Sequence, residues 1–280
     1  MNFKLTHIPK RPEKPREKGL TMVMDKGLSL RQAEDLIEVA GDKIDLLKLG
    51  FGTSYVTNNL AEKIKLFQAN NIQVYPGGTL FEAFIARKKF GDFRKFLDQY
   101  NLDMCEVSDG SIVLNHNEKC EYVQKLAKNR VVLSEVGSKE QGILISPSKW
   151  IKMMQNELEA GSWKVIAEGR ESGSVGIFRP NGTPHTILIN KIIAKIPPDK
   201  ILWEAPGKKQ QVWFINIFGT NVSLGNIAPN DVIPLECLRL GLRGDTFFNY
   251  LPENIIDDLQ QPEGDHAKAR QAKKETEKAK

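Results

Sequence analysis

The strongest constraint on the fold is a regular alternation of two kinds of segment along the chain of 280 residues. Eight short runs rich in apolar and β-branched residues lie at 20–24, 44–49, 72–75, 102–107, 131–136, 164–168, 201–204 and 221–224. Longer segments with helical spacing separate these runs. The segment 29–41, for example, begins with Ser29 as a helix N-cap and ends with Gly41 as the glycine just past a helix. Strands that alternate with helices pair in parallel, so eight such units predict a single-domain (β/α)8 TIM barrel.

An open, doubly wound sheet is the main alternative for the same alternation. Such a sheet usually carries a glycine-rich dinucleotide-binding turn after its first strand, whereas here the first strand runs into Asp25-Lys26-Gly27. We therefore predict the barrel, over residues 19–258. We expect residues 1–18 to form a basic, flexible arm and residues 259–280 to form a charged, disordered tail.

The positive charge of the chain lies mainly at its two ends. The formal net charge is +5, but residues 1–19 contribute +4 and residues 262–280 contribute +2, which leaves the remainder at about −1. We therefore expect no nucleic-acid partner. No apolar run approaches the roughly 18 residues of a membrane span, and no secretory signal follows the N-terminal charges. Three cysteines without CxxC spacing point to a reducing, cytoplasmic environment, and a homo-oligomer is compatible with the sequence.

Carboxylates recur where consecutive predicted strands end. The fourth to seventh strands finish with Glu106, Glu135, Glu168 and Glu204. Because the carboxyl ends of barrel strands meet at one mouth, these side chains would repel one another unless a cation or a proton relieves them. Mg²⁺ suits an all-oxygen donor set, and the absence of histidine and cysteine from these ends argues against zinc. The alternative is a layer of structural ion pairs in which each glutamate pairs with a neighbouring lysine or arginine.

Other strand ends offer groups for an anionic substrate. Gly77, Gly78 and Thr79 precede a helix and present backbone N–H groups, while Gly225 and Asn226 follow the eighth strand, where this fold commonly binds phosphate. Arg170 lies two residues after Glu168, so the period of a strand directs it toward the same mouth, where it can clamp an oxyanion. Ser108, after the fourth strand, completes the substrate-binding candidates.

Two lysines are the candidate proton donors. Lys48 projects inward from the second strand if its parity holds, and Lys139 follows the fifth strand. Each would act either as an acid whose pKa is lowered by burial or as a structural cation beside the carboxylates, and the sequence leaves both roles open. The four histidines all fall away from the strand ends, so histidine catalysis is not indicated.

Eight sequence blocks together resemble one known family. They are GLTMVMDKGLS, LLKLGFGTS, VYPGGTLFEAF, EVSDGSI, LSEVGSK, AEGRESGSVGIF, WEAPGKKQQVWFI and LECLRLGLRGDTFF, and they extend over residues 19–248. The chain resembles the phosphosulfolactate synthase family, which also includes plant heat-stress-associated proteins.

The resemblance implies a (β/α)8 barrel and a carbon–sulfur lyase that adds sulfite to phosphoenolpyruvate with Mg²⁺, giving (2R)-phospho-3-sulfolactate. In methanogens this reaction opens coenzyme M synthesis. Lys139 matches the position expected for the acid that protonates C2, with Lys48 as second choice. The family often has two adjacent lysines after Glu-Val-Gly, where this chain has Ser138 and then Lys139, and Gly225 replaces an alanine of some relatives.

Two other functions are compatible with the sequence. One is a non-catalytic, stress-related homologue of the same fold. The other is a barrel enzyme that adds a different nucleophile to an enol phosphate. The converging charges favour the two enzymes over the scaffold, because a scaffold has no physical need for them.

Overall fold

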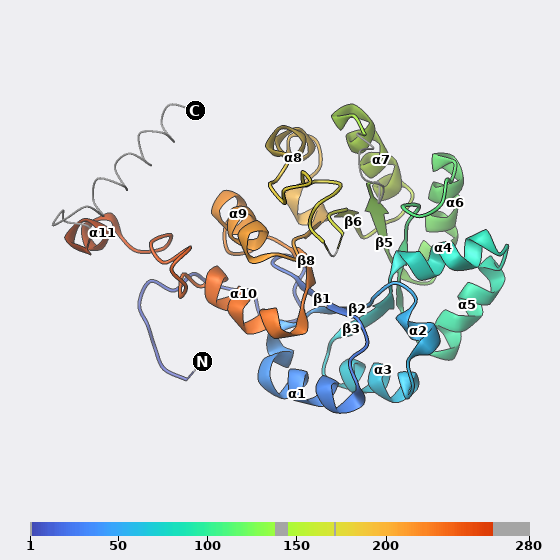
Figure 1. Ribbon diagram of the computed structural model, residues 1–280, viewed down its shortest axis with the longest axis horizontal. Coiled ribbons are helices and arrows are strands. Elements are labelled where there is room, and N and C mark those ends of the chain that lie inside the picture. The colour runs from blue at the N-terminus through green and yellow to red at the C-terminus, as the bar shows by residue number, and fades with distance from the viewer. Residues whose placement is uncertain (1, 138–144, 171, 260–280) are drawn as a thin grey trace.

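Eight parallel strands form one curled sheet at the centre of the molecule, and helices surround it (Figure 1). The computed structural model describes residues 2–137, 145–170 and 172–259. The strands are β1 (Thr21–Asp25), β2 (Leu46–Leu49), β3 (Gln73–Pro76), β4 (Met104–Val107), β5 (Val131–Val136), β6 (Lys164–Ala167), β7 (Ile201–Glu204) and β8 (Leu224–Ile227). Their order is β3-β2-β1-β8-β7-β6-β5-β4, and the end strands β3 and β4 lie against each other. The predicted (β/α)8 TIM barrel is therefore confirmed.

The helices follow the strands in sequence, and those up to α10 surround the barrel, whereas α11 lies away from it (Figure 1). They are α1 (Leu30–Ala40), α2 (Thr53–Val56), α3 (Leu60–Ala69), α4 (Gly78–Ala86), α5 (Phe90–Gln99), α6 (His116–Ala127), α7 (Pro147–Glu159), α8 (Thr186–Ile193), α9 (Lys208–Phe218), α10 (Val232–Arg239) and α11 (Glu253–Leu259). Short 3₁₀ turns occupy η1 (Gly41–Lys43), η2 (Pro198–Lys200) and η3 (Pro229–Asp231).

The strands bury both of their faces, as parallel strands between helices and a barrel interior must. Outward-facing side chains of the strands join the helices in one large apolar core. Inward-facing side chains form a second, smaller cluster inside the barrel: Leu20, Met22, Leu46, Tyr75, Met104, Leu133, Ile166 and Leu202. This inner cluster is an apolar plug on which the residues of the barrel mouth rest.

Seven of the eight predicted strands agree with the structure to within two residues at each end, but the eighth was placed too early. We predicted residues 221–224, whereas β8 is Leu224–Ile227. Carbonyls of the loop before β8 bond a side chain instead of a neighbouring strand. Arg239 donates to the carbonyls of Thr220 and Val222 at 2.6 and 2.7 Å. Backbone pairing with the neighbouring strands starts at Ser223, whose carbonyl accepts from the Trp203 N–H at 3.1 Å, and continues at Leu224, whose N–H donates to the carbonyl of Leu20 at 2.9 Å.

The start of the first helix is confirmed, and Gly41 lies just past its end, as we predicted. Ser29 caps α1, and Gln32 completes a capping box with it. Gly41 has φ −57°, which any residue can adopt, and it continues the chain into η1 instead of reversing it with a positive φ. The glycine therefore ends α1 without the left-handed conformation that is common near helix C-termini.

The basic N-terminal arm contacts the amino end of the barrel and lies beside α10 (Figure 1). The Arg11 guanidinium binds Glu236 of α10 at 3.1 Å and the Asn221 side chain at 2.7 Å. Arg16, almost fully buried, pairs with Asp45 at 2.8 Å, and the Lys14 ammonium donates to the carbonyl of Ile44. The arm, which we expected to be flexible, thus makes specific contacts through its charges. The predicted tail from residue 260 onward lies outside the described residues.

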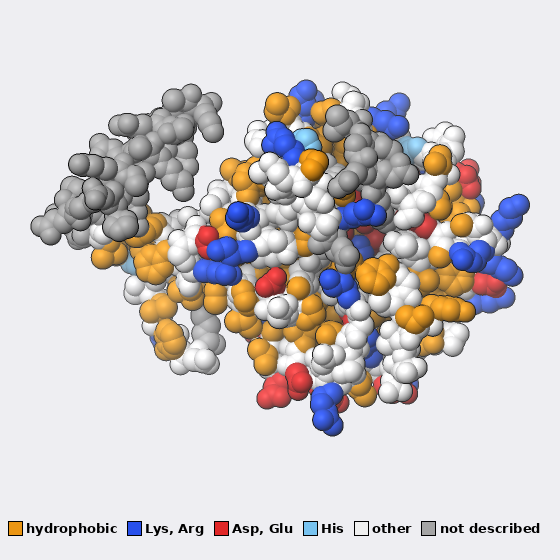
Figure 2. All heavy atoms as spheres, viewed as in Figure 1, with side chains coloured by type: hydrophobic (Ala, Val, Ile, Leu, Met, Phe, Trp, Pro, Cys, Tyr) orange, Lys and Arg blue, Asp and Glu red, His pale blue; other side chains and the backbone are white. Residues whose placement is uncertain are grey.

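Charged side chains are spread over the face seen in Figure 2 and do not gather into one basic patch. Within the described ranges, no helix has the length and apolar character needed to cross a membrane.

Replacing Arg239 tests the closure of the sheet at β8. Arg239 is fully buried, and its guanidinium also donates to the Leu20 carbonyl at 3.1 Å. Arg239→Met should lower the free energy of unfolding by about 3 kcal/mol, because buried carbonyls lose charged donors. Urea denaturation measures this loss. Arg243→Met, at a partly exposed site on the surface, should change the same quantity by less than about 0.5 kcal/mol. Equal effects of the two substitutions would contradict this account.

Candidate functional site

The period of the strands places one layer of charged residues directly above the apolar plug. Each charged residue lies two positions after an inward-facing apolar residue of the same strand, so both point into the barrel. The pairs are Leu46 and Lys48, Met104 and Glu106, Leu133 and Glu135, Ile166 and Glu168, and Leu202 and Glu204. One lysine and four glutamates therefore meet at the carboxyl ends of five strands.

A cavity of about 430 Å³ opens above this charged layer. Nine of the predicted site residues line it: Lys48, Gly78, Thr79, Glu106, Glu135, Glu168, Arg170, Glu204 and Asn226. Gly77, Ser108 and Gly225 do not line it. Lys139, our first candidate for the acid, lies outside the described residues. The cavity is large enough for a three-carbon phosphate, whose usual binding sites are pockets of a few hundred Å³ or more.

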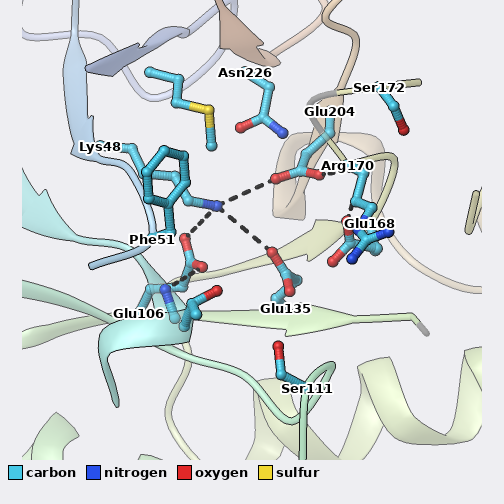
Figure 3. A pocket seen from close by; sticks show the side chains of 13 residues that line it. Lys48, Phe51, Glu106, Ser111, Glu135, Glu168, Arg170, Ser172, Glu204 and Asn226 are labelled. Atoms are coloured by element: carbon cyan, nitrogen blue, oxygen red, sulfur yellow. Dashed lines mark hydrogen bonds and ion pairs between the residues drawn. The ribbon is translucent and has the colours of Figure 1, made fainter. Parts of the chain in front are cut away.

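Lys48 is the cation around which three of the glutamates gather (Figure 3). Its ammonium nitrogen lies 3.0 Å from Glu106 Oε2, 3.2 Å from Glu204 Oε1 and 3.5 Å from Glu135 Oε2. Burial alone lowers the pKa of Lys48, but the charges of Glu106, Glu204 and Glu135 outweigh burial and raise this pKa well above its ordinary value. Of the two roles that we left open, the structure supports the structural cation.

Three carboxylates come close enough together to share a metal ion. One oxygen each from Glu135, Glu168 and Glu204 lies within 4.8 Å of the other two, and all three side chains are buried. An all-oxygen donor set of this kind fits Mg²⁺ or another hard divalent cation. Glu106 is not a member of this group of three. Its carboxylate pairs with Lys48 and also accepts from the Gly78 N–H at the N-terminus of α4.

The loop after β6 holds two of these carboxylates with its backbone. The N–H of Arg170 donates to Glu168 Oε1 at 2.7 Å and to Glu204 Oε2 at 3.0 Å, and the Gly169 N–H also donates to Glu204 Oε2 at 3.0 Å. Arg170 has a φ of +59°, which turns these amides toward the cavity. Gly176 closes the loop at φ +62°, where a Cβ would lie only 2.0 Å from the Glu168 carbonyl oxygen. The glycines of this loop thus allow its close approach to Glu168.

A glycine at the start of α4 also donates a backbone hydrogen bond to a carboxylate. The Gly78 N–H, which we assigned to a phosphate, donates to Glu106 Oε1 at 2.7 Å. A Cβ on Gly78 would lie 2.2 Å from Ser108 Oγ, so the close approach of the start of α4 to the residue after β4 requires glycine here. Gly77 is the N-cap of the helix and does not line the cavity, whereas Thr79 does. The positive end of α4 therefore binds a glutamate within the described structure.

Two further candidates are structural, and a third is available to a ligand. Ser108 is fully buried and its hydroxyl donates to Glu82 of α4, which explains its absence from the cavity wall. Gly225 lies within β8, where a Cβ would meet Met22 at 2.6 Å. Asn226 has a φ of +56°, and its buried Oδ1 has no hydrogen-bond partner among the described residues. Such an atom at a cavity wall is suited to contact a ligand.

Four lining residues were not found from the sequence: Met24, Phe51, Ser111 and Ser172. Phe51 has a φ of +36°, which is unusual for an aromatic residue and indicates strain at the cavity mouth. Its neighbours Gly50 and Gly52 were a visible signal of a tight turn there. Serines in loops carry no comparable signal, so Ser111 and Ser172 could not be separated from ordinary surface residues.

Fold and site together define a (β/α)8-barrel protein with an acidic cleft at the carboxyl ends of its strands, in which three carboxylates lie close together. The sequence matches the family model described as (2R)-phospho-3-sulfolactate synthase (ComA) over residues 9–245. The chain therefore belongs to the phosphosulfolactate synthase family, as its sequence blocks indicated.

Curated relatives agree with this assignment. A phosphosulfolactate synthase of Bacillus subtilis (strain 168) is 39% identical over 251 residues, covering 89% of this chain and 100% of the relative. That of Methanocaldococcus jannaschii is 40% identical over 237 residues, covering 82% of this chain and 94% of the relative. A plant relative, HEAT-STRESS-ASSOCIATED 32 of Arabidopsis thaliana, is 22% identical over 82% of this chain and 88% of its own length.

Solved structures resemble the chain in fold. The 3-hexulose-6-phosphate synthase of Salmonella typhimurium superposes with a TM-score of 0.53 at 13% identity, covering 80% of this chain and 100% of that chain. A 3-keto-L-gulonate-6-phosphate decarboxylase of Vibrio cholerae gives a TM-score of 0.51 at 12% identity, with coverages of 84% and 100%. At these identities the likeness concerns the barrel alone.

Removing the Lys48 ammonium tests whether it holds the carboxylates together. Lys48→Met should lower the free energy of unfolding by about 3–5 kcal/mol, because three buried carboxylates lose their common cation. Excess Mg²⁺ should restore part of this loss by binding the carboxylates in the folded state. Urea denaturation with Mg²⁺ and with EDTA measures both effects.

The exposed Lys65 on α3 provides the control for Lys48→Met. Lys65→Met removes the same charge and should change stability by less than about 0.5 kcal/mol, with or without Mg²⁺. A Lys48→Met protein as stable as the wild type would contradict the assigned role.

Proposed function

We propose that this protein catalyses the Mg²⁺-dependent addition of sulfite to phosphoenolpyruvate, giving (2R)-phospho-3-sulfolactate. It acts as a carbon–sulfur lyase in the direction of synthesis. The observation that supports the proposal most strongly is the meeting of Glu135, Glu168 and Glu204, three buried carboxylates whose oxygens lie within 4.8 Å of one another in a chain of this family.

The three carboxylates are the residues that would hold Mg²⁺. When bound, Mg²⁺ supplies positive charge that polarises the substrate carboxylate and offsets the negative charge that develops there. Lys48 remains a fixed cation beside Glu106, so the mouth can accept anionic substrates even though it contains four glutamates.

Other lining residues are suited to bind and orient the two anions. The Arg170 side chain lies at the cavity beside Glu168, where its guanidinium can clamp phosphate or sulfite oxygens (Figure 3). Asn226, on β8, offers an amide group whose Oδ1 has no protein partner in the described structure. Phe51 lines the same cavity and offers it an apolar surface (Figure 3).

The reaction needs one nucleophile, one electron sink and one proton. The sulfite sulfur uses its lone pair to form a bond to C3, and the electrons of the C2–C3 double bond move toward the substrate carboxylate. A proton then adds to C2, so the phosphate ester is retained and no group leaves. Resemblance to the family assigns this proton to Lys139, which follows the positive-φ residue Gly137 at the end of β5.

A non-catalytic scaffold explains the site less well. Burying several carboxylates together costs several kcal/mol before their partners compensate, and a scaffold gains nothing from this cost. An enzyme that adds a different nucleophile to an enol phosphate would need the same divalent cation and the same phosphate-binding groups. The assay must therefore compare sulfite with other nucleophiles.

Loss of the enol-ester ultraviolet absorbance of phosphoenolpyruvate tests the proposal. The absorbance should fall when sulfite and Mg²⁺ are both present, and EDTA should stop the change. Folded protein that consumes no phosphoenolpyruvate under these conditions would overturn the proposed function. Consumption with another small anion but not with sulfite would replace the nucleophile.

Substituting Lys139 tests its assignment as the proton donor. Lys139→Ala should lower kcat by about 10²- to 10⁴-fold, the usual contribution of general acid catalysis, while the protein stays folded. Steady-state kinetics with phosphoenolpyruvate and sulfite measure the change. Lys128→Ala, an exposed lysine after α6, should leave kcat within twofold of the wild type. If Lys139→Ala retains wild-type kcat, another group delivers the proton.

A further inference from the structure

A second buried charge network lies behind β5, outside the cavity. At its centre is Lys119 of α6, whose side chain is fully buried. The ammonium donates to the backbone carbonyl of Glu135 at 2.6 Å and to Asp109 Oδ1 at 2.9 Å, and it pairs with Glu157 Oε1 of α7 at 2.9 Å. A fully buried lysine is uncommon in proteins, and this one touches the backbone of a candidate metal ligand.

The Lys119 ammonium supplies a donor beyond the point where the pairing between β4 and β5 stops. The ladder between β4 and β5 ends with the pair Val107 and Ser134, one residue before Glu135. The carbonyl of Glu135 therefore lies past the last paired residue of that ladder, and Lys119 bonds it from the helix side. This bond fixes the backbone from which the Glu135 carboxylate enters the mouth.

Lys119 also holds the loop between β4 and α6 through Asp109. Glu82 of α4 binds the same loop from the other side, accepting from the N–H of Gly110 at 3.1 Å and from the N–H of Ser111 at 2.7 Å. Ser111 lines the cavity (Figure 3). A buried ammonium and a buried carboxylate thus clamp a loop that forms part of the cavity wall.

We propose that Lys119 is a positioning residue of the site, which sets the affinity for a divalent cation by fixing Glu135 relative to Glu168 and Glu204. Residues that hold the ligands of a metal usually change metal affinity 10- to 100-fold when they are removed. The catalytic consequence rests on the proposed function, but the effect on cation binding does not require turnover.

The test separates positioning from stability by removing the charges in pairs. Lys119→Met alone leaves Glu157 buried without its cation and should lower the urea midpoint strongly. Lys119→Met/Glu157→Met removes both charges at similar volume and should recover most of the midpoint. The dissociation constant for Mn²⁺, measured by titration calorimetry, should nevertheless stay at least 10-fold above the wild-type value in the double variant.

A buried ion pair at the opposite end of the barrel supplies the matched control. Arg16 and Asp45 are 4% and 6% exposed and pair at 2.8 Å, far from the carboxyl ends of the strands. Arg16→Met/Asp45→Asn should lower the urea midpoint but leave the Mn²⁺ dissociation constant within twofold of the wild type.

Kinetics give a second readout that a purely structural role would not move. The double variant at Lys119 and Glu157 should need a higher Mn²⁺ concentration for half-maximal rate, while its KM for phosphoenolpyruvate at saturating Mn²⁺ stays within twofold. Mn²⁺ affinity equal to that of the wild type in the double variant would overturn the proposal, and so would a wild type that binds no Mn²⁺. A wild type that binds Mn²⁺ but consumes no phosphoenolpyruvate would overturn only the proposed function.

Discussion

The contact of one ammonium with three carboxylates is the interaction on which the candidate site depends. Glu106, Glu135 and Glu204 reach the same point because each follows an inward-facing apolar residue by two positions on its strand. At separations of 3.0 to 3.5 Å, Lys48 offsets the repulsion that would otherwise drive these carboxylates apart or protonate them. The barrel brings the carboxylates together, and the positive charge of Lys48 offsets their mutual repulsion.

The carboxylates are also held in place by backbone groups of the surrounding loops and of α4. The amides of Gly78, Gly169 and Arg170 each donate to a glutamate, and Lys119 bonds the backbone that carries another. Donors that are held by helices and tight loops do not need to reorganise when a cation or an anion binds. The site is therefore preorganised, and Arg170 and Asn226 are the cavity-wall groups best placed to meet a ligand.

The sequence predicts the features that depend on strand period and on alternation. The barrel and the meeting of four glutamates follow from those patterns, and the structure confirms both. Features that depend on contacts between distant segments could not be predicted from the sequence. Nothing in the sequence around Gly78 indicates that its N–H donates to Glu106. Likewise, nothing local to residues 221–223 indicates that Arg239 binds this loop, so the predicted eighth strand begins three residues before the observed β8. No local pattern in the sequence distinguishes Lys119 from an exposed lysine of α6, and its burial follows from the packing of α6 against its neighbours.

The central claim is that three glutamates form a site for one divalent cation, and diffraction from crystals soaked in Mn²⁺ tests it most directly. Anomalous scattering should place one Mn²⁺ between Glu135, Glu168 and Glu204, with carboxylate oxygens at about 2.1–2.2 Å, close to the distances of hard-cation sites. Lys48 should keep its contact with Glu106 in the same crystals. An empty mouth at saturating Mn²⁺, or an ion bound elsewhere in the barrel, would contradict the account.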